Sequence, residues 1–195
     1  MISTLLFCLG IGSMPGAEWT PGSGFRSASL AVPSSDAVGF ASMDPAFTGL
    51  YFTNVIARAR YMTNQIYLNG SGVTAGDVDG DEKVDLFFAG LDGKNRLYKN
   101  LGGWRFEDIT DRAGVGAANI ASTGCAFADI DGDRDLDLLV NSIGQGTHLF
   151  TNDGKGKFVW QTQRRAPNSG KGGMSMALSD VDGDGDLDLY LANYR

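Results

Sequence analysis

A nine-residue acidic segment occurs three times in this chain and limits the possible folds more than any other feature. The copies read DVDGDEKVD at residues 77–85, DIDGDRDLD at 129–137 and DVDGDGDLD at 180–188. Their starting points lie 52 and then 51 residues apart. A fixed period of this length is typical of repeat proteins, which have one structural unit per period. The chain is therefore predicted to be a repeat protein.

Each copy carries Asp at positions 1, 3, 5 and 9 of the segment and Gly at position 4. Asp and Gly are ordinary turn residues, so one such segment alone could be a solvated turn. Three copies in register, each with at least four carboxylates, would instead repel themselves unless a cation neutralised them. Alternating Asp side chains on a tight turn direct several hard oxygens at one point. That arrangement suits Ca²⁺ better than Mg²⁺, which prefers fewer carboxylates and more water.

The sequence therefore predicts one Ca²⁺ for each of the three segments. An EF-hand is excluded, because its loop requires Gly at position 6 and Glu at position 12. Here position 6 is Glu82, Arg134 or Gly185, and position 12 is Phe88, Val140 or Leu191. The predicted side-chain ligands occupy positions 1, 3, 5 and 9: Asp77, Asp79, Asp81, Asp85; Asp129, Asp131, Asp133, Asp137; Asp180, Asp182, Asp184 and Asp188.

Short strands are predicted on both sides of each acidic segment. Small residues precede it, which suits an inner strand crowded by neighbouring backbones, and apolar residues follow it. A third strand, a Gly-rich turn and a fourth strand then complete the period, which is typical of a β-propeller blade. The predicted strands lie at 73–76, 86–88, 96–98 and from Phe106; at 125–128, 136–140, 148–150 and from Phe158; and at 175–178 and 187–191.

Two further segments are expected to be extended. Residues 52–55 (FTNV) are similar to residues 106–109 (FEDI) and are predicted to form an outer strand. Residues 66–68 (IYL) lie in the connection that leads to the first inner strand, and they are predicted to be extended as well.

The acidic segment and the apolar strand after it (EKVDLFFAGL, DRDLDLLVNS, DGDLDLYLAN) resemble the FG-GAP/VCBS repeat of integrin-α-like β-propellers. The wider pattern, SGVTAGDVDGD followed by NRLYKNLGGWRFEDIT, is similar to the propellers of the ASPIC/UnbV and cartilage acidic protein group. This resemblance covers residues 52–195. It implies an all-β, partial β-propeller of four-stranded blades, with a Ca²⁺ loop between the first and second strands of each blade. It also implies that position 7, which is Lys83, Asp135 or Asp186, supplies its backbone carbonyl to the ion.

The periodicity gives two whole blades and half of a third, out of an expected seven. The chain is therefore interpreted as the N-terminal fragment of a longer protein. In that interpretation the outer strand at 52–55 completes the last blade, together with strands that follow Arg195.

The N-terminal region is expected to lie outside the propeller. Residues 1–17 contain a short apolar run and are predicted to be a secretory signal peptide. The run is too short to span a bilayer, so no transmembrane segment is expected. Residues 18–50 form a Gly/Ser/Pro-rich extension, and residues 51–195 form the partial propeller. The predicted location is secreted, periplasmic or on the cell surface.

The charge and composition of the chain limit the classes of function that can be expected. Fourteen of the twenty Asp residues lie in the three segments, so the net charge of −7 is interpreted as ligand charge. The 16 Lys and Arg residues form no basic patch, which argues against nucleic-acid binding. His148 is the only His and has no nucleophile motif nearby in the sequence, and Cys125 is interpreted as a small buried residue.

The predicted function is a calcium-binding adhesion scaffold for a protein or glycan ligand, and not an enzyme. The alternative is a propeller module of a polysaccharide-active enzyme whose catalytic residues lie elsewhere.

Overall fold

The computed structural model describes residues 20–23, 26–27, 41–162 and 167–194. The chain divides into two compact units, Met1–Ser42 and Met43–Arg195. In the first unit, the two-residue strands β1 (Thr20–Pro21) and β2 (Arg26–Ser27) pair antiparallel. The predicted signal peptide at 1–17 lies outside the described residues.

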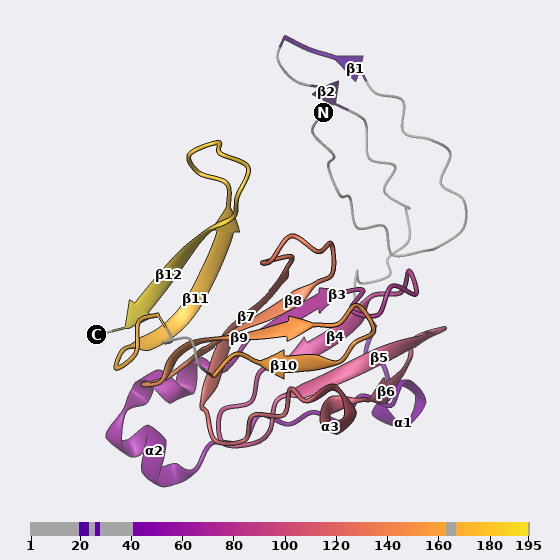
Figure 1. Cartoon of the computed structure of the whole chain (residues 1–195). Helices are drawn as coiled ribbons and strands as arrows, with labels where there is room; N and C mark the ends of the chain where they lie inside the picture. Colours follow the sequence, from indigo (N-terminus) through magenta and orange to yellow (C-terminus); the bar gives the residue numbers. More distant parts are fainter. Residues whose placement is uncertain (1–19, 24–25, 28–40, 163–166, 195) are drawn as a thin grey trace. The chain divides into compact units, whose positions relative to one another are not determined.

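The second unit contains two four-stranded antiparallel sheets and one two-stranded sheet (Figure 1). In each sheet the strands are neighbours in chain order, as a propeller blade requires. The all-β, blade-like architecture predicted from the sequence is thus confirmed. The first sheet comprises β3 (Val73–Gly76), β4 (Asp85–Phe88), β5 (Arg96–Gly102) and β6 (Arg105–Asp108). The second comprises β7 (Ser122–Ala128), β8 (Asp137–Ser142), β9 (Gly146–Asn152) and β10 (Phe158–Trp160), and the third β11 (Gly172–Ser179) and β12 (Asp188–Tyr194).

Each acidic segment is the loop that joins the first and second strands of its sheet, as predicted. The loops are called the first, second and third acidic loops below, and their residues are numbered 1 to 9 from the first Asp. The strand that follows a loop begins at position 9, which is Asp85 in β4, Asp137 in β8 and Asp188 in β12.

The hydrophobic core is formed by the first two sheets and the segments between them. Strand β8 is buried at every residue, because β7 and β9 flank it and apolar side chains cover both faces. Strand β12 has a similar apolar pattern, but most of it is exposed among the described residues. The core side chains are Val78, Phe87, Ala89, Leu97, Ile109, Ala113, Val115, Ile120, Leu138, Val140, Phe150 and Phe158.

The inner strands β3, β7 and β11 lie next to one another, which explains their small residues. The N–H of Gly72 donates to the carbonyl of Thr123 at 2.6 Å, just before β3 begins. The hydroxyl of Thr123 donates to the carbonyl of Gly173 at 2.5 Å. A Cβ atom on Gly124 would lie only 2.8 Å from the carbonyl oxygen of Met174. Adjacent sheets therefore approach through their backbones, and larger side chains would separate them.

The prediction of an outer strand at residues 52–55 is wrong, because this segment is not a strand and pairs with none of the strands in the described part of the chain. Side-chain contacts and one backbone hydrogen bond, from the N–H of Asp92 to the carbonyl of Val55 at 3.1 Å, hold it in place instead. The amide of Asn54 donates to the hydroxyl of Ser71 at 2.8 Å, and its oxygen accepts from the N–H of Leu91 at 3.1 Å. The ring of Phe52 stacks on that of Phe88, with 5.1 Å between the ring centroids.

The prediction of an extended segment at 66–68 is also wrong, because these residues belong to the 3-10 helix η1 (Gln65–Asn69). The side chain of Asn64 accepts from the N–H of Ile66 at 3.1 Å and so caps the first turn. Three short helices complete the unit: α1 (Pro45–Thr48), α2 (Arg58–Thr63) and α3 (Thr110–Ala113). Among the described residues, no helix has the length and apolar character that a membrane crossing needs.

Candidate metal centre

The carboxylate at position 1 organises the turn of each acidic loop. In the first loop, Asp77 accepts from the N–H of Gly80 at 2.8 Å and from that of Glu82 at 2.7 Å. Asp129 and Asp180 accept in the same way from positions 4 and 6 of their own loops, at 2.7 to 3.1 Å. The turn winds around this carboxylate because positions 4 and 6 have positive φ in all three loops.

The carboxylate at position 9 joins the base of the loop to the rest of the sheet. Asp85 and Asp137 are fully buried. In each loop one oxygen of the position 9 carboxylate accepts from the N–H at position 2, at 3.0 to 3.1 Å. The other oxygen of Asp85 accepts from the N–H of Asn100 at 2.7 Å, and that of Asp137 accepts from the N–H of Asn152 at 2.9 Å.

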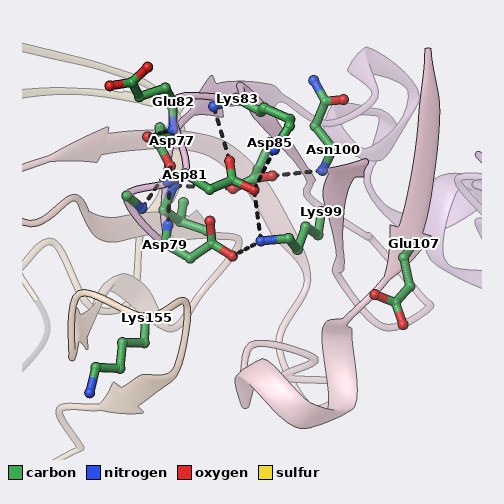
Figure 2. A network of polar contacts seen from close by, with 12 residues as sticks. Asp77, Asp79, Asp81, Glu82, Lys83, Asp85, Lys99, Asn100, Glu107 and Lys155 are labelled. Carbon is green, nitrogen blue, oxygen red and sulfur yellow. Dashed lines mark hydrogen bonds and ion pairs between the residues drawn. The ribbon is translucent and has the colours of Figure 1, made fainter. Parts of the chain in front are cut away.

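Positions 1, 3 and 9 bring one carboxylate oxygen each to a common point. Within each group the three oxygens lie within 4.8 Å of one another. Figure 2 shows the first loop, where Asp77, Asp79 and Asp85 surround the centre of the turn. The three groups are Asp77, Asp79, Asp85; Asp129, Asp131, Asp137; and Asp180, Asp182, Asp188.

The predicted ligands at positions 5 and 7 are not part of these groups. The carboxylates of Asp81, Asp133 and Asp184 accept instead from the backbone N–H at position 7, at 2.9 to 3.0 Å. Position 7 is Lys83, Asp135 or Asp186, and its ligation through the carbonyl stays a prediction.

The three groups differ in burial. The first is half-buried around a buried Asp85, and the second contains the buried Asp137 with an exposed Asp131. All three Asp residues of the third group are exposed. Asp188 accepts from Val181, but among the described residues no third strand adds the second N–H that Asp85 and Asp137 receive.

Burial raises the pKa of the Asp85 and Asp137 carboxyls above the ordinary range, and the other Asp residues of each loop add to this effect. The backbone N–H groups of Asn100 and Asn152 act in the opposite direction. At Asp81, hydrogen bonds from the ammonium groups of Lys99 and then Lys83 lower the carboxyl pKa to about 2.

The residues of each group fit a hard divalent cation. All the converging atoms are carboxylate oxygens, the donor type that Ca²⁺ prefers. In the first loop Asp79 Oδ1 is buried and has no hydrogen-bond partner among the described residues. A buried carboxylate oxygen without a donor is unfavourable, and a cation between the three Asp residues would satisfy it.

Three residues around the loops were missed by the sequence reasoning: Lys99, Asn100 and Asn152. The two Asn residues stand at the same place in successive periods, 15 residues after position 9, so the repetition itself could have identified them. The amide of Asn100 donates to the carbonyl of Val84 at 2.9 Å. That of Asn152 donates to Leu136 at 3.1 Å and also to Val78, in the first loop, at 2.8 Å.

Neither His148 nor Cys125 belongs to the acidic loops. His148 Nε2 lies 3.0 Å from the hydroxyl of Ser142, and its ring meets the ring of Trp160 edge-on. Cys125 is a free cysteine that packs against the core, and burial raises the pKa of its thiol to about 12. The interpretation of Cys125 as a small core residue agrees with this packing.

The geometry defines a class of repeat protein: consecutive antiparallel blades, each with an acidic loop after its first strand. A family model described as FG-GAP-like repeat matches residues 77–140 and 132–191, more than half of the chain. The chain belongs to this family of FG-GAP-like repeat proteins. A comparison with curated proteins found no match. The closer likeness to the ASPIC/UnbV and cartilage acidic protein group stays a prediction.

Proposed function

We propose that this chain is a calcium-binding β-propeller segment that acts outside the cytoplasm as a scaffold for binding a protein or glycan, and that it is not itself an enzyme. One observation carries the calcium assignment. Carboxylates at positions 1, 3 and 9 converge to within 4.8 Å in all three loops, although only the position 9 Asp is part of a strand. The convergence is repeated in every copy of the segment, although five other residues of each loop vary or bind elsewhere, which supports a common use for these three carboxylates.

Electrostatics supports a cation at these groups. Two carboxylates about 4 Å apart repel by about 4 kcal/mol at the effective dielectric constant of a protein surface. The buried Asp85 and Asp137 have in addition lost much of their hydration. When bound, Ca²⁺ would neutralise this charge and join the turn of each loop to the start of the following strand. The backbone N–H groups already hold positions 1 and 9 in place, so each site is largely preformed.

The proposed location rests on the apolar run within residues 1–17 and on the chemistry of calcium. Extracellular calcium modules bind with dissociation constants of about 10⁻⁴ to 10⁻³ M, and exposed sites such as the third loop suit that range. The scaffold role rests on membership of the FG-GAP-like repeat family.

Calorimetric titration of the full chain with CaCl₂ tests the calcium assignment. Heat of binding and uptake of up to three ions are expected. Asp131→Asn should remove one site and leave the others. Asp111→Asn is a matched control, because Asp111 is an exposed Asp outside the loops. Failure to take up Ca²⁺ at millimolar concentration would contradict the proposal.

The scaffold role is tested separately by binding of the labelled full chain to a glycan array. The same experiment is run on immobilised extracellular-matrix proteins, in CaCl₂ and again in EDTA. Calcium-dependent binding to one glycan class or one protein is expected. Hydrolysis of the arrayed glycans would instead support the alternative of a polysaccharide-active enzyme.

A further inference from the structure

The first acidic loop contains an internal cation. Lys99 extends from β5 into this loop, and its ammonium group contacts Asp79 and lies 3.0 Å from Asp81 Oδ2 (Figure 2). Lys83 places a second ammonium group 3.0 Å from the same oxygen of Asp81. The side chain of Lys99 is only 22% exposed, so most of it is enclosed by the surrounding loop and strand.

Among the described residues, no strand sends such a cation into the second loop. Lys99 and Thr151 occupy equivalent places, because each directly precedes the Asn whose N–H reaches the position 9 Asp. The Thr151 hydroxyl accepts from the side chain of Gln161 at 2.7 Å. Among the residues that the structure describes, no Lys or Arg forms an ion pair with an Asp of the second or third loop.

The basic residues in and around the loops decrease from the first loop to the third. Each nine-residue loop carries five acidic side chains. The first loop has Lys83 within it and receives Lys99 from β5, the second has only Arg134, and the third has no basic residue. Calcium affinity in loops of this kind is set by the net ligand charge and the rigidity of the site.

We propose that Lys99 is a built-in counter-cation, which orders the first loop without a metal and makes it a weaker Ca²⁺ site than the second loop. This inference rests on the proposed function, because it concerns the affinity of a loop that binds Ca²⁺. The ammonium group of Lys99 and a Ca²⁺ ion require the same carboxylate, that of Asp79. Lys99 contacts Oδ2 of Asp79 and the unpartnered Oδ1 is left for the ion, so Ca²⁺ in the first loop binds beside a cation that the second loop does not contain.

The consequence is a graded response to calcium. The second loop fills at a lower concentration, whereas the first loop fills at a higher one, because Lys99 repels the incoming ion and already offsets part of the charge of Asp79. Because Lys99 offsets part of the negative charge of the first loop, this loop also stays ordered when calcium is scarce.

The reciprocal exchange of the two equivalent residues tests the inference. Lys99→Thr gives the first loop the residue of the second, and Thr151→Lys does the reverse. The full chain is titrated with CaCl₂ alone at constant ionic strength, and amide resonances are followed by NMR. Gly80 and Gly132 report on the two sites separately, because the N–H of each donates to the position 1 carboxylate of its own loop.

In the wild-type chain the midpoint for Gly80 is expected at a higher Ca²⁺ concentration than that for Gly132. Lys99→Thr should lower the Gly80 midpoint about tenfold or more and leave that of Gly132 unchanged, since a partly buried charge contact is removed. Thr151→Lys should raise the Gly132 midpoint.

In EDTA, Lys99→Thr should lower the melting temperature. The control Lys94→Thr removes an exposed ion pair and should leave the melting temperature unchanged.

An unchanged Gly80 midpoint in Lys99→Thr would overturn the inference while the calcium function stands. If neither Gly80 nor Gly132 responds at millimolar Ca²⁺, both the function and the inference fail. Should Lys99→Thr not fold, Lys99→Met keeps the packing of the aliphatic chain and removes only the charge, and the same shift is expected.

Discussion

Asp137 is fully buried at the start of β8, and its two carboxylate oxygens accept from the N–H groups of Ile130 and Asn152. Asp137→Ala should destabilise the chain by about 2–4 kcal/mol, because it leaves two buried N–H groups without acceptors. Urea unfolding in EDTA measures this cost without the contribution of calcium. The control is Asp133→Ala at the exposed position 5, where a loss below about 1 kcal/mol is expected. Equal midpoints for the two variants would show that position 9 has no special role.

His148 provides a pH-dependent contribution that is separate from the loops. The hydroxyl of Ser142 donates to the carbonyl of Gly146 at 2.8 Å, so the neutral His148 ring must donate to that hydroxyl through Nε2. Burial lowers the pKa of His148 below its ordinary value of 6.5. The unfolded chain therefore binds a proton first as the pH falls. The contribution of His148 to stability is complete above about pH 6.5 and is lost as the pH falls through the folded pKa.

The predicted result is a steeper loss of melting temperature between pH 7.5 and 5 for the wild-type chain than for His148→Gln, with both in EDTA. Differential scanning calorimetry at a series of pH values measures both slopes. Both chains contain the same carboxylates, so the effect of their titration cancels when one slope is subtracted from the other. Parallel slopes would mean that the ring stays accessible to protons in the folded state.

The acidic loops also depend on a left-handed backbone conformation at position 4, which is Gly in all three copies. Gly132 has a φ of 81°, and a Cβ atom there would meet no neighbour within 4 Å. Gly132→Ala should therefore cost about 1–2 kcal/mol through left-handed backbone strain alone. Gly93→Ala is the matched control, because Gly93 is equally open and has no positive φ. It should be neutral or slightly stabilising. Chemical denaturation of both variants checks the difference, and equal effects would exclude strain as the reason for Gly at position 4.

The strands were largely predictable from the sequence, whereas the connecting segments were not. Short apolar runs and their repetition after each acidic loop locate β4, β8 and β12 to within one or two residues at their starts. Residues 52–55 and 66–68 have similar apolar character but do not form strands. Their conformations depend on the side chains of Asn54 and Asn64. Asn64 caps a backbone N–H two residues away, whereas Asn54 binds the N–H of the distant Leu91.

The same distinction holds within the candidate site. The repeated spacing identifies positions 1, 3, 5 and 9 directly, and the structure brings the carboxylates of positions 1, 3 and 9 together. Position 5 was predicted to join them, but its carboxylate caps the backbone of position 7 instead. The approach of Lys99 to Asp79 could not be predicted, because it depends on the register between β4 and β5.

For the whole molecule, removal of calcium is the most direct perturbation. A ligand that binds only the folded chain stabilises it by about 2.7 kcal/mol per site at one hundred times its dissociation constant. Excess EDTA should therefore lower the melting temperature by about 5 °C or more relative to saturating CaCl₂. Differential scanning calorimetry measures the shift, and MgCl₂ at equal concentration should restore less of it. A melting temperature that is indifferent to EDTA would exclude a stabilising role for calcium.

The amide of Asn152 has a consequence for how such a chain can be divided. It belongs to the second sheet, yet it donates to the carbonyl of Val78 in the first acidic loop. One sequence repeat therefore does not contain all the residues that pack around its own acidic loop, because one of them comes from the next repeat. A copy of the segment 73–121 transferred into another protein would take the first loop with it but leave one of its buried partners behind. Exchange of modules in this family should succeed only when the cut falls after the third strand of the following blade.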